Sequence, residues 1–328
     1  MKGEEFKDDF RRALPKALVL ELTRRSGWRA SLAILSDVVI IAVAIAVALA
    51  YWPNPLIIFF SVLVIGTRQH ALFVISHDAA HYLLFDDRRA NDWAGRACAT
   101  IQGLSMCSYR VIHRMHHNNL YGELDPDTAL HGGYPRGRWY LIRKLLKDLS
   151  GLTAWKTYAY FLFAAPALNT ATNQALRPLD DTSERLRNEA RHDRNMVIAF
   201  HLLLLIGFAA SGYLVQYLVL WVLPLVTVVQ AILRLRAIAE HGATTDFSSP
   251  LTAARTNLAP AWLRWVLFPH NVNYHIEHHL YASVPMYNLP RLHEEMKRQG
   301  VLEGAELVYF PETLKKIFAD RKLVTVTN

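Results

Sequence analysis

The chain has 328 residues, of which 52% are hydrophobic, and it carries a formal net charge of +8 with only two cysteines. So few cysteines exclude a disulfide framework, and no recognised nucleic-acid-binding motif accompanies the positive charge, so no nucleic-acid partner is expected. Apolar stretches of about 20 residues, long enough to cross the hydrocarbon core of a bilayer, exclude an ordinary soluble domain.

Two apolar segments near the start of the chain predict the first two membrane spans. They cover about residues 32–52 and 56–76, and the turn at residues 53–55 (Pro-Asn-Pro) separates them. The residues before the first span carry many charges of both signs and no small-residue cleavage motif. We therefore expect an anchor rather than a removable signal peptide.

Two further apolar segments predict a third span at 197–211 and a fourth at 214–233, separated by the turn at 211–213. The third segment is short for a span, and a crossing would need tilt, a locally thinner bilayer or extra helical turns. A hydrophobic hairpin that enters the membrane without crossing it is the alternative for this pair.

The distribution of positive charge predicts the orientation in the membrane. All 36 lysines and arginines except Arg68 lie in residues 1–30, 82–195 or 234–328. The predicted outer turns carry none, so the positive-inside rule places both termini and both hydrophilic segments in the cytoplasm. We expect an all-α integral membrane protein of a bacterial inner membrane. Residues 1–328 would form one domain of four transmembrane helices with a cytoplasmic helical cap.

Arg68 lies in the second span, about as deep as Asp37 in the first. A cation inside a span usually has a partner or extends toward the interface. Arg68 could form an ion pair with Asp37, or its side chain could snorkel to the interface. In both cases we expect a structural role. Cys98 and Cys107 are expected to be buried without a disulfide, because they lie on the cytoplasmic side.

Helices are also predicted in the two hydrophilic segments, at about residues 91–117, 139–149, 289–299 and 311–321. The apolar and aromatic stretch 154–168 contains Lys156 and Pro166, so it suits an interfacial helix better than a fifth span. The fourth span is expected to continue beyond the membrane to His241 and to end at Gly242.

Eight of the 15 histidines form three clusters with the sequences HDAAH, HRMHH and HIEHH. They are His77, His81, His113, His116, His117, His275, His278 and His279. Spacings of three or four residues place the side chains of one cluster on one helix face, about 5–6 Å apart. All three clusters lie on the predicted cytoplasmic side, so they can meet at one site.

Imidazole is the commonest protein ligand of zinc, copper and iron, because its neutral nitrogen is available near pH 7. Eight imidazoles exceed the ligands that one ion takes, so the pattern predicts two metals. His241 is a ninth candidate, and the alternative for it is an ordinary polar residue at a helix end. The ligand set permits zinc, copper or iron, and redox chemistry on a lipid favours iron.

Polar residues beside the clusters are candidates for orienting metal-bound imidazoles. They are Asp125, Glu240, His270, Asn271, Asn273 and Glu277. Asp125 and Asp127 also suit a turn after the second cluster. His70 lies about 10 Å along the helix axis from His77, so we expect it to pack or to support the site rather than to bind metal. The four remaining histidines are expected to be ordinary: His131, His192, His201 and His293.

The three clusters, the Asp-Pro-Asp turn at 125–127 and the segment NYHIEHHLYASVP resemble the histidine boxes of membrane fatty acid desaturases. The resemblance covers most of the chain, since the boxes follow the predicted spans in the family's order. It implies a mushroom-like helical bundle whose cytoplasmic cap holds two iron ions, with the eight box histidines as ligands. His241 matches an additional family histidine. Some members have an asparagine four residues before it, where Ala237 stands here.

The resemblance also implies a chemistry. The two iron ions would react with O2 and remove hydrogen from an unactivated C–H bond; loss of a second hydrogen gives an alkene, and return of oxygen gives an alcohol. Front-end desaturases typically begin the third box with glutamine, where His275 stands. No HPGG haem motif is present, so electrons are expected from a separate protein, either a ferredoxin or a cytochrome-type carrier.

The leading hypothesis is an O2-dependent di-iron desaturase that introduces a double bond into a fatty acyl chain of a lipid or thioester. A lipid or carotenoid hydroxylase or ketolase on the same scaffold is the closest alternative. A non-enzymatic metal-binding or transport protein is a third. Transporters usually place their ligands near the membrane midplane, whereas these clusters lie outside the predicted spans.

Overall fold

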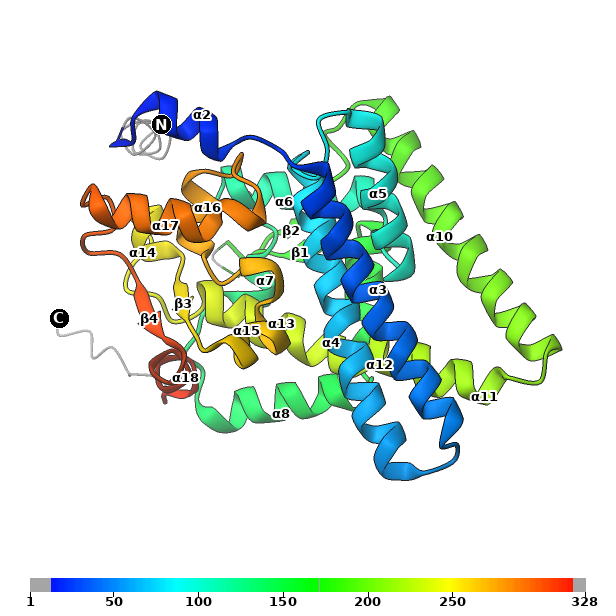
Figure 1. Ribbon diagram of the computed structural model, residues 1–328. Coiled ribbons are helices and arrows are strands. Elements are labelled where there is room, and N and C mark those ends of the chain that lie inside the picture. Colours follow the sequence, from blue (N-terminus) through cyan, green and yellow to red (C-terminus); the bar gives the residue numbers. More distant parts are fainter. Residues whose placement is uncertain (1–12, 171, 321–328) are drawn as a thin grey trace.

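A computed structural model of the protein describes residues 13–170 and 172–320, and nearly all of its regular structure is helical (Figure 1). The α-helices are α2 (Lys16–Leu22), α3 (Gly27–Ala50), α4 (Pro55–Ala80), α5 (Arg88–Ile101), α6 (Met106–Asn118), α7 (Thr128–His131), α8 (Arg138–Leu149), α9 (Ala154–Phe163), α10 (Glu184–Ala210), α11 (Leu214–Tyr217), α12 (Leu223–Val226), α13 (Val228–His241), α14 (Pro250–Ala253), α15 (Ala261–Leu267), α16 (His275–Leu280), α17 (Leu289–Arg298) and α18 (Phe310–Phe318). The π-turn η1 (Leu218–Val222) and the 3-10 turns η2 (Pro269–Asn271) and η3 (Met286–Asn288) complete the helical elements.

The strands are short and form two separate pairs. They are β1 (Ala167–Leu168), β2 (Ala175–Leu176), β3 (Thr256–Leu258) and β4 (Leu307–Tyr309). β1 and β2 pair antiparallel, whereas β3 and β4 pair parallel with Thr256 opposite Leu307. The second pair joins the segment before the third histidine cluster to the segment before α18.

Four helical stretches are long and apolar enough to cross a membrane: α3, α4, α10 and the continuous run Leu214–His241 from α11 to α13. The predicted all-α fold class with four candidate spans is therefore confirmed. α4 lies in the core, and its apolar window is 67% buried, whereas that of α10 is only 11% buried. Leu32, Val43, Leu203 and Ile206 are exposed on α3 and α10, as expected of side chains that contact lipid.

The helices that contain the predicted spans differ from them in extent, chiefly at the third span. α10 starts at Glu184 rather than near residue 197, so the helix has 27 residues and its length no longer argues against a crossing. Its polar first half is helical because it packs against the cap. There Asp193 accepts hydrogen bonds from the Arg96 side chain at 2.9 Å and from the backbone N–H of Cys107 at 2.8 Å.

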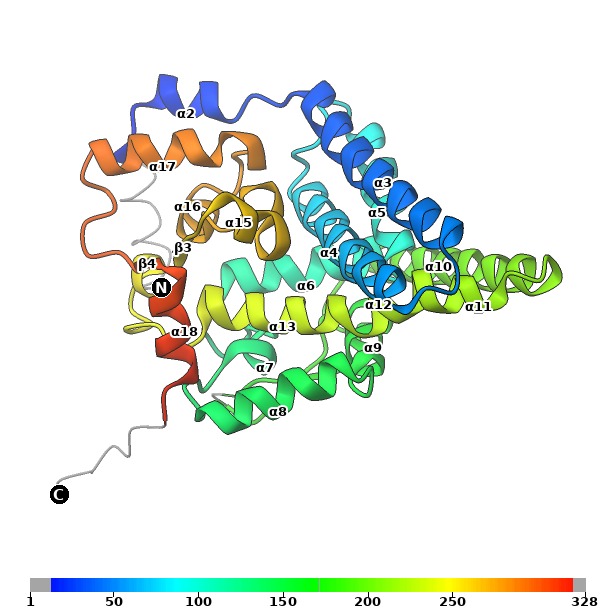
Figure 2. The ribbon, with the colours of Figure 1, turned by 60° about the horizontal axis from the view of Figure 1, so that its bottom comes forward.

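The cap forms at the end of the spans opposite the turns near residues 52 and 212, and Figures 1 and 2 show α14 to α18 gathered there beside α13. The predicted helix at 91–117 is two helices, α5 and α6, because Gly103 has a positive φ of 78° and Ser105 caps a new helix. α8, α17 and α18 confirm the other predicted cap helices. In the stretch 154–168, the ten-residue helix α9 is followed by strand β1.

Arg68 and Asp37 form the ion pair that the sequence left open, with Arg68 Nη1 3.2 Å from Asp37 Oδ1. Both side chains are almost completely buried, so snorkelling is excluded. The Arg68 guanidinium also lies 3.8 Å from the ring centroid of Trp265. His270 Nε2 donates to the second oxygen of Asp37 at 2.7 Å. This network joins α3 and α4 to the segment that precedes the third cluster.

Candidate metal centre

Three long helices and one short helix bring the nine candidate histidines together. His77 lies in the last turn of α4, and His81 is the residue that caps this helix. The second cluster lies on α6, which begins where the Ser105 side chain accepts a hydrogen bond from the N–H of Ser108 at 3.1 Å. His241 is the last residue of α13, and the third cluster occupies α16.

The side-chain nitrogens of these histidines form two groups, and within each group all of them lie within 4.8 Å of one another. The five-nitrogen group consists of His77, His81, His113, His117 and His278. The four-nitrogen group consists of His116, His241, His275 and His279. The second and third clusters are thus both divided between the groups, because adjacent residues on a helix point about 100° apart.

The spacing within the groups suits metal ligation. The Nε2–Nε2 distances are 2.9 Å for His81–His113, 3.0 Å for His117–His278, 3.2 Å for His116–His241 and 2.8 Å for His241–His275. Neighbouring nitrogens on one ion are about 3 Å apart, since metal–nitrogen bonds are about 2.0–2.1 Å. His77 Nε2 is buried without a hydrogen-bond partner among the described residues. The two groups can therefore each hold a cation.

The surroundings keep most of these imidazoles neutral. Eight of the nine are buried, and His81 alone is partly exposed. Burial, reinforced by neighbouring histidines, holds the pKa of His113, His117 and His278 well below the usual value. Burial also lowers the pKa of His81 to about 4, with Arg114 and Arg110 as further causes. Neutral imidazoles have the free lone pair that metal binding requires.

Asp125 orients one box histidine directly. Its side chain is fully buried and accepts a hydrogen bond from His116 Nδ1 at 3.0 Å, which leaves Nε2 of His116 free for the four-nitrogen group. Asp125 is itself held by the backbone N–H groups of Tyr121 and Asp127, at 2.8 and 3.0 Å. Burial alone would lower the pKa of His116, but Asp125 and Asp127 raise it to about 9.

Three of the other candidates for orienting residues, Glu277, Asn273 and His270, contact different partners. Glu277 accepts from Thr256 Oγ1 and from His293 Nδ1, both at 2.5 Å. Asn273 donates to the backbone oxygen of Asn257 at 3.2 Å. The side-chain hydrogen bond described for His270 goes to Asp37, away from the box histidines. His293, expected to be ordinary, thus holds the carboxylate that lies inside the third cluster.

His131 is the residue at this site that the sequence analysis missed. It is buried, and both of its ring nitrogens lack a hydrogen-bond partner among the described residues. Its ring centroid lies 4.7 Å from that of His241 and 5.7 Å from that of His116. No sequence spacing pointed to it, because its single position in α7 follows a turn and repeats no ligand pattern.

A cavity lies beside both nitrogen groups, between α4, α6, α9 and α13. Phe73, Tyr109, Phe161 and Leu233 line its apolar part. At its polar end it is lined by His77, His113, His116, His241 and His275, together with Glu240 and His131. This cavity places apolar side chains beside both nitrogen groups.

The comparison with protein families agrees with this geometry. A model of the family described as fatty acid desaturase matches residues 52–312, which include all nine histidines. The chain belongs to the fatty acid desaturase family.

Several curated proteins are similar to this desaturase-family chain at low identity. Dihydrorhizobitoxine desaturase of Bradyrhizobium elkanii is 25% identical over 249 residues, which are 73% of this chain and 66% of that protein. The chloroplastic omega-3 fatty acid desaturase of Glycine max is 24% identical over 88% of this chain and 64% of that protein. The sn-1 acyl-lipid omega-3 desaturase (ferredoxin) of Nostoc sp. (strain 36) is 26% identical over 80% of this chain and 73% of that protein. The chain thus matches just under two thirds of the length of the first two.

In this desaturase-family chain, replacing Asp125 with asparagine is expected to weaken metal binding at the four-nitrogen group about 10- to 100-fold. The substitution removes the charge that holds His116 in its metal-binding orientation. Metal retained after dialysis against a chelator measures the effect. Asp181→Asn, the same change at an exposed position, is the control. Equal metal retention in both variants would refute the orienting role of Asp125.

Proposed function

We propose that this chain is an integral membrane di-iron enzyme that uses O2 to introduce a double bond into a fatty acyl chain of a lipid or thioester. The observation that carries the proposal is the convergence of nine histidine nitrogens into two groups beside a cavity with an apolar wall. Membership of the desaturase family and the desaturase names of the relatives support the same reaction.

The residues present fit two cations. Lone pairs of neutral imidazoles only 2.8–3.0 Å apart, as in His241–His275 and His117–His278, repel one another unless a proton or a cation lies between them. The buried, unpartnered Nε2 of His77 points to the same need. We assign one iron ion to the five-nitrogen group and the other to the four-nitrogen group. When bound, the pair would supply the reduction of O2 and the oxidation of the C–H bond.

The protein's own residues would position the substrate and orient the ligands. The apolar walls of Phe73, Phe161 and Leu233 hold a hydrocarbon chain and exclude water from it. Asp125 keeps the proton of His116 on Nδ1, so that Nε2 remains a ligand. Glu240 lies 3.8 Å from His275 Nε2 and is tied to Arg236 at 3.1 Å, which places a carboxylate at the edge of the four-nitrogen group.

The overall reaction balances only with an external reductant. Two hydrogen atoms leave adjacent carbons of the acyl chain as the double bond forms, and O2 is reduced to two molecules of water. Two further electrons and two protons are required. We propose that a separate carrier, a ferredoxin or a cytochrome-type protein, supplies the electrons. The ferredoxin in the name of the Nostoc relative supports the first choice.

We propose the cytoplasmic side of a bacterial inner membrane for the site and both termini. The support is the charge pattern: the cap segments hold nearly all lysines and arginines, while the turns near residues 53 and 212 hold none. All nine histidines lie at the cap end of the four candidate spans. A single cytoplasmic site would therefore meet lipid from the membrane and reductant from the cytoplasm.

Product analysis tests the proposal. The chain is expressed in a host of known lipid composition under 18O-labelled O2, and lipids and pigments are examined by mass spectrometry. The expected product is an acyl chain that has lost two hydrogen atoms and contains no 18O. Lipids from the host without the gene serve as the control.

The alternatives give different products. An 18O atom in a lipid or a carotenoid would establish a hydroxylase or ketolase on the same scaffold and overturn the desaturase proposal. Unchanged lipids and pigments with a co-expressed electron carrier, together with purified protein free of iron, would favour a metal-binding or transport protein.

A further inference from the structure

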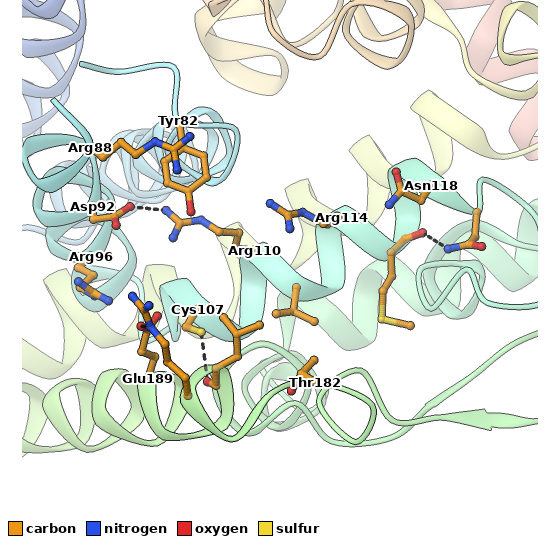
Figure 3. Close-up of a pocket in the computed structure, with 15 residues that line it drawn as sticks. Tyr82, Arg88, Asp92, Arg96, Cys107, Arg110, Arg114, Asn118, Thr182 and Glu189 are labelled. Carbon is orange, nitrogen blue, oxygen red and sulfur yellow. Dashed lines mark hydrogen bonds and ion pairs between the residues drawn. The ribbon is translucent and has the colours of Figure 1, made fainter. Parts of the chain in front are cut away.

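A basic cleft of about 740 Å³ lies between α5, α6 and the start of α10 (Figure 3). We define it by its five arginines: Arg88, Arg96, Arg110, Arg114 and Arg185. They come from three helices, and Figure 3 shows Arg110 and Arg114 on successive turns of α6, facing the cleft. Positive charge from separate elements is thus gathered on one concave surface.

Three of the five arginines form ion pairs within the described part of the protein, and two do not. Arg96 pairs with Asp193 at 2.9 Å, Arg110 with Asp92 at 2.5 Å, and Arg185 with Glu189 at 3.0 Å. Arg88 instead stacks over the Tyr82 ring at 4.8 Å.

Arg88 and Arg114 are both exposed, and no carboxylate of the described residues lies within ion-pair distance of either. They leave the cleft with a positive charge available to a partner.

The basic cleft continues to the metal centre. A second cavity of about 240 Å³ shares Tyr82, Arg110, Arg114 and Asn118 with it. At the other end this second cavity is lined by His81, His113, His117 and His279. His81 is the one histidine of the nine that is not buried. The basic surface therefore leads to the most accessible part of the five-nitrogen group.

The cleft and the apolar cavity lie on opposite faces of α6. Tyr109, His113 and His116 face the apolar cavity, whereas Arg110 and Arg114 face the cleft. Two reactants can thus approach the centre from different sides. The apolar side suits the acyl chain, and the basic side suits a reactant that is negatively charged and water-soluble.

We propose that the basic cleft is the docking surface for an acidic one-electron carrier protein, whose electron enters the five-nitrogen group past His81. This inference rests on the proposed function. Each docking event oxidises the carrier by one electron, so two events accompany each double bond. Charge complementarity of this kind speeds association and selects the partner more than it adds affinity. The route beside His81 favours a redox partner over a lipid headgroup, which would need no access to the centre.

Binding of a plant-type [2Fe–2S] ferredoxin to the full-length protein in lipid nanodiscs tests this inference. We expect Arg114→Glu and Arg88→Glu each to lower the association rate about tenfold at low salt and to flatten its salt dependence. Arg143→Glu makes the same charge change at an exposed position on α8, which α4 and α13 separate from α5. This control should bind like the wild type.

The iron content and melting temperature of each variant separate a docking effect from misfolding. The Arg88 variant is an independent test, because α5 carries none of the nine histidines. Unchanged ferredoxin association in both cleft variants, or an equal loss in Arg143→Glu, would overturn the inference. The inference would also be overturned if the two cleft variants bound less phosphatidylglycerol in nanodiscs than the wild type while they bound ferredoxin normally. That result would assign the cleft to a lipid headgroup. Ferredoxin binding is measured without substrate. A failure of the docking inference is therefore distinguishable from a failure of the desaturase proposal, which product analysis tests.

Discussion

Replacing His278 with alanine is expected to reduce product formation more than 100-fold. His278 Nε2 lies 3.0 Å from Nε2 of His117, and its ring centroid lies 4.4 Å from that of His77, so its loss opens the five-nitrogen group. Loss of an orienting partner costs about 10- to 100-fold, and loss of a ligand itself should cost more. Product yield and iron per protein are measured together.

The matched control for this prediction is His192→Ala, which removes an exposed histidine on α10. It should keep both the iron and the product. If His278→Ala retained normal oxidation activity, the assignment of an iron ion to the five-nitrogen group would be wrong. Normal activity with unchanged iron in all three variants His278→Ala, His117→Ala and His77→Ala would remove the di-iron proposal altogether.

The second large effect is expected at the buried ion pair between the first two spans. Asp37→Ala should destabilise the protein by about 3–5 kcal/mol, because it leaves the buried Arg68 guanidinium without its carboxylate. It also removes the acceptor of His270, which connects the spans to the third cluster. Unfolding of the purified protein in detergent, followed by its circular dichroism, measures the loss.

A double variant distinguishes an unpaired charge from a simple loss of packing. Asp37→Leu combined with Arg68→Met replaces the pair with apolar side chains, and such replacements are often neutral or stabilising. We expect the double variant to recover most of the stability. A single Asp37→Ala variant as stable as the wild type would show that the pair contributes nothing.

The apolar segments were predictable because the thickness of the bilayer sets the length of a spanning helix. The ends of the helices that contain these segments were not predictable. α10 starts well before the predicted third span, since its polar first half is stabilised by cap contacts such as Arg96 with Asp193. The break between α5 and α6 at Gly103 was also missed, because the amphipathic pattern of the two helices looks continuous.

The amino-acid sequence alone determined which histidines belong together, because ligand spacing of three or four residues is a local property of a helix. Only the tertiary structure decided how they divide into groups of five and four, since each group takes nitrogens from helices far apart in the chain. The same holds for the supporting contacts. Asp125 lies nine positions after His116 in the chain, and residue type alone suggested that it supports the site. His270, 233 residues from Asp37, and His131, beside His241, owe their positions to packing that no local pattern encodes.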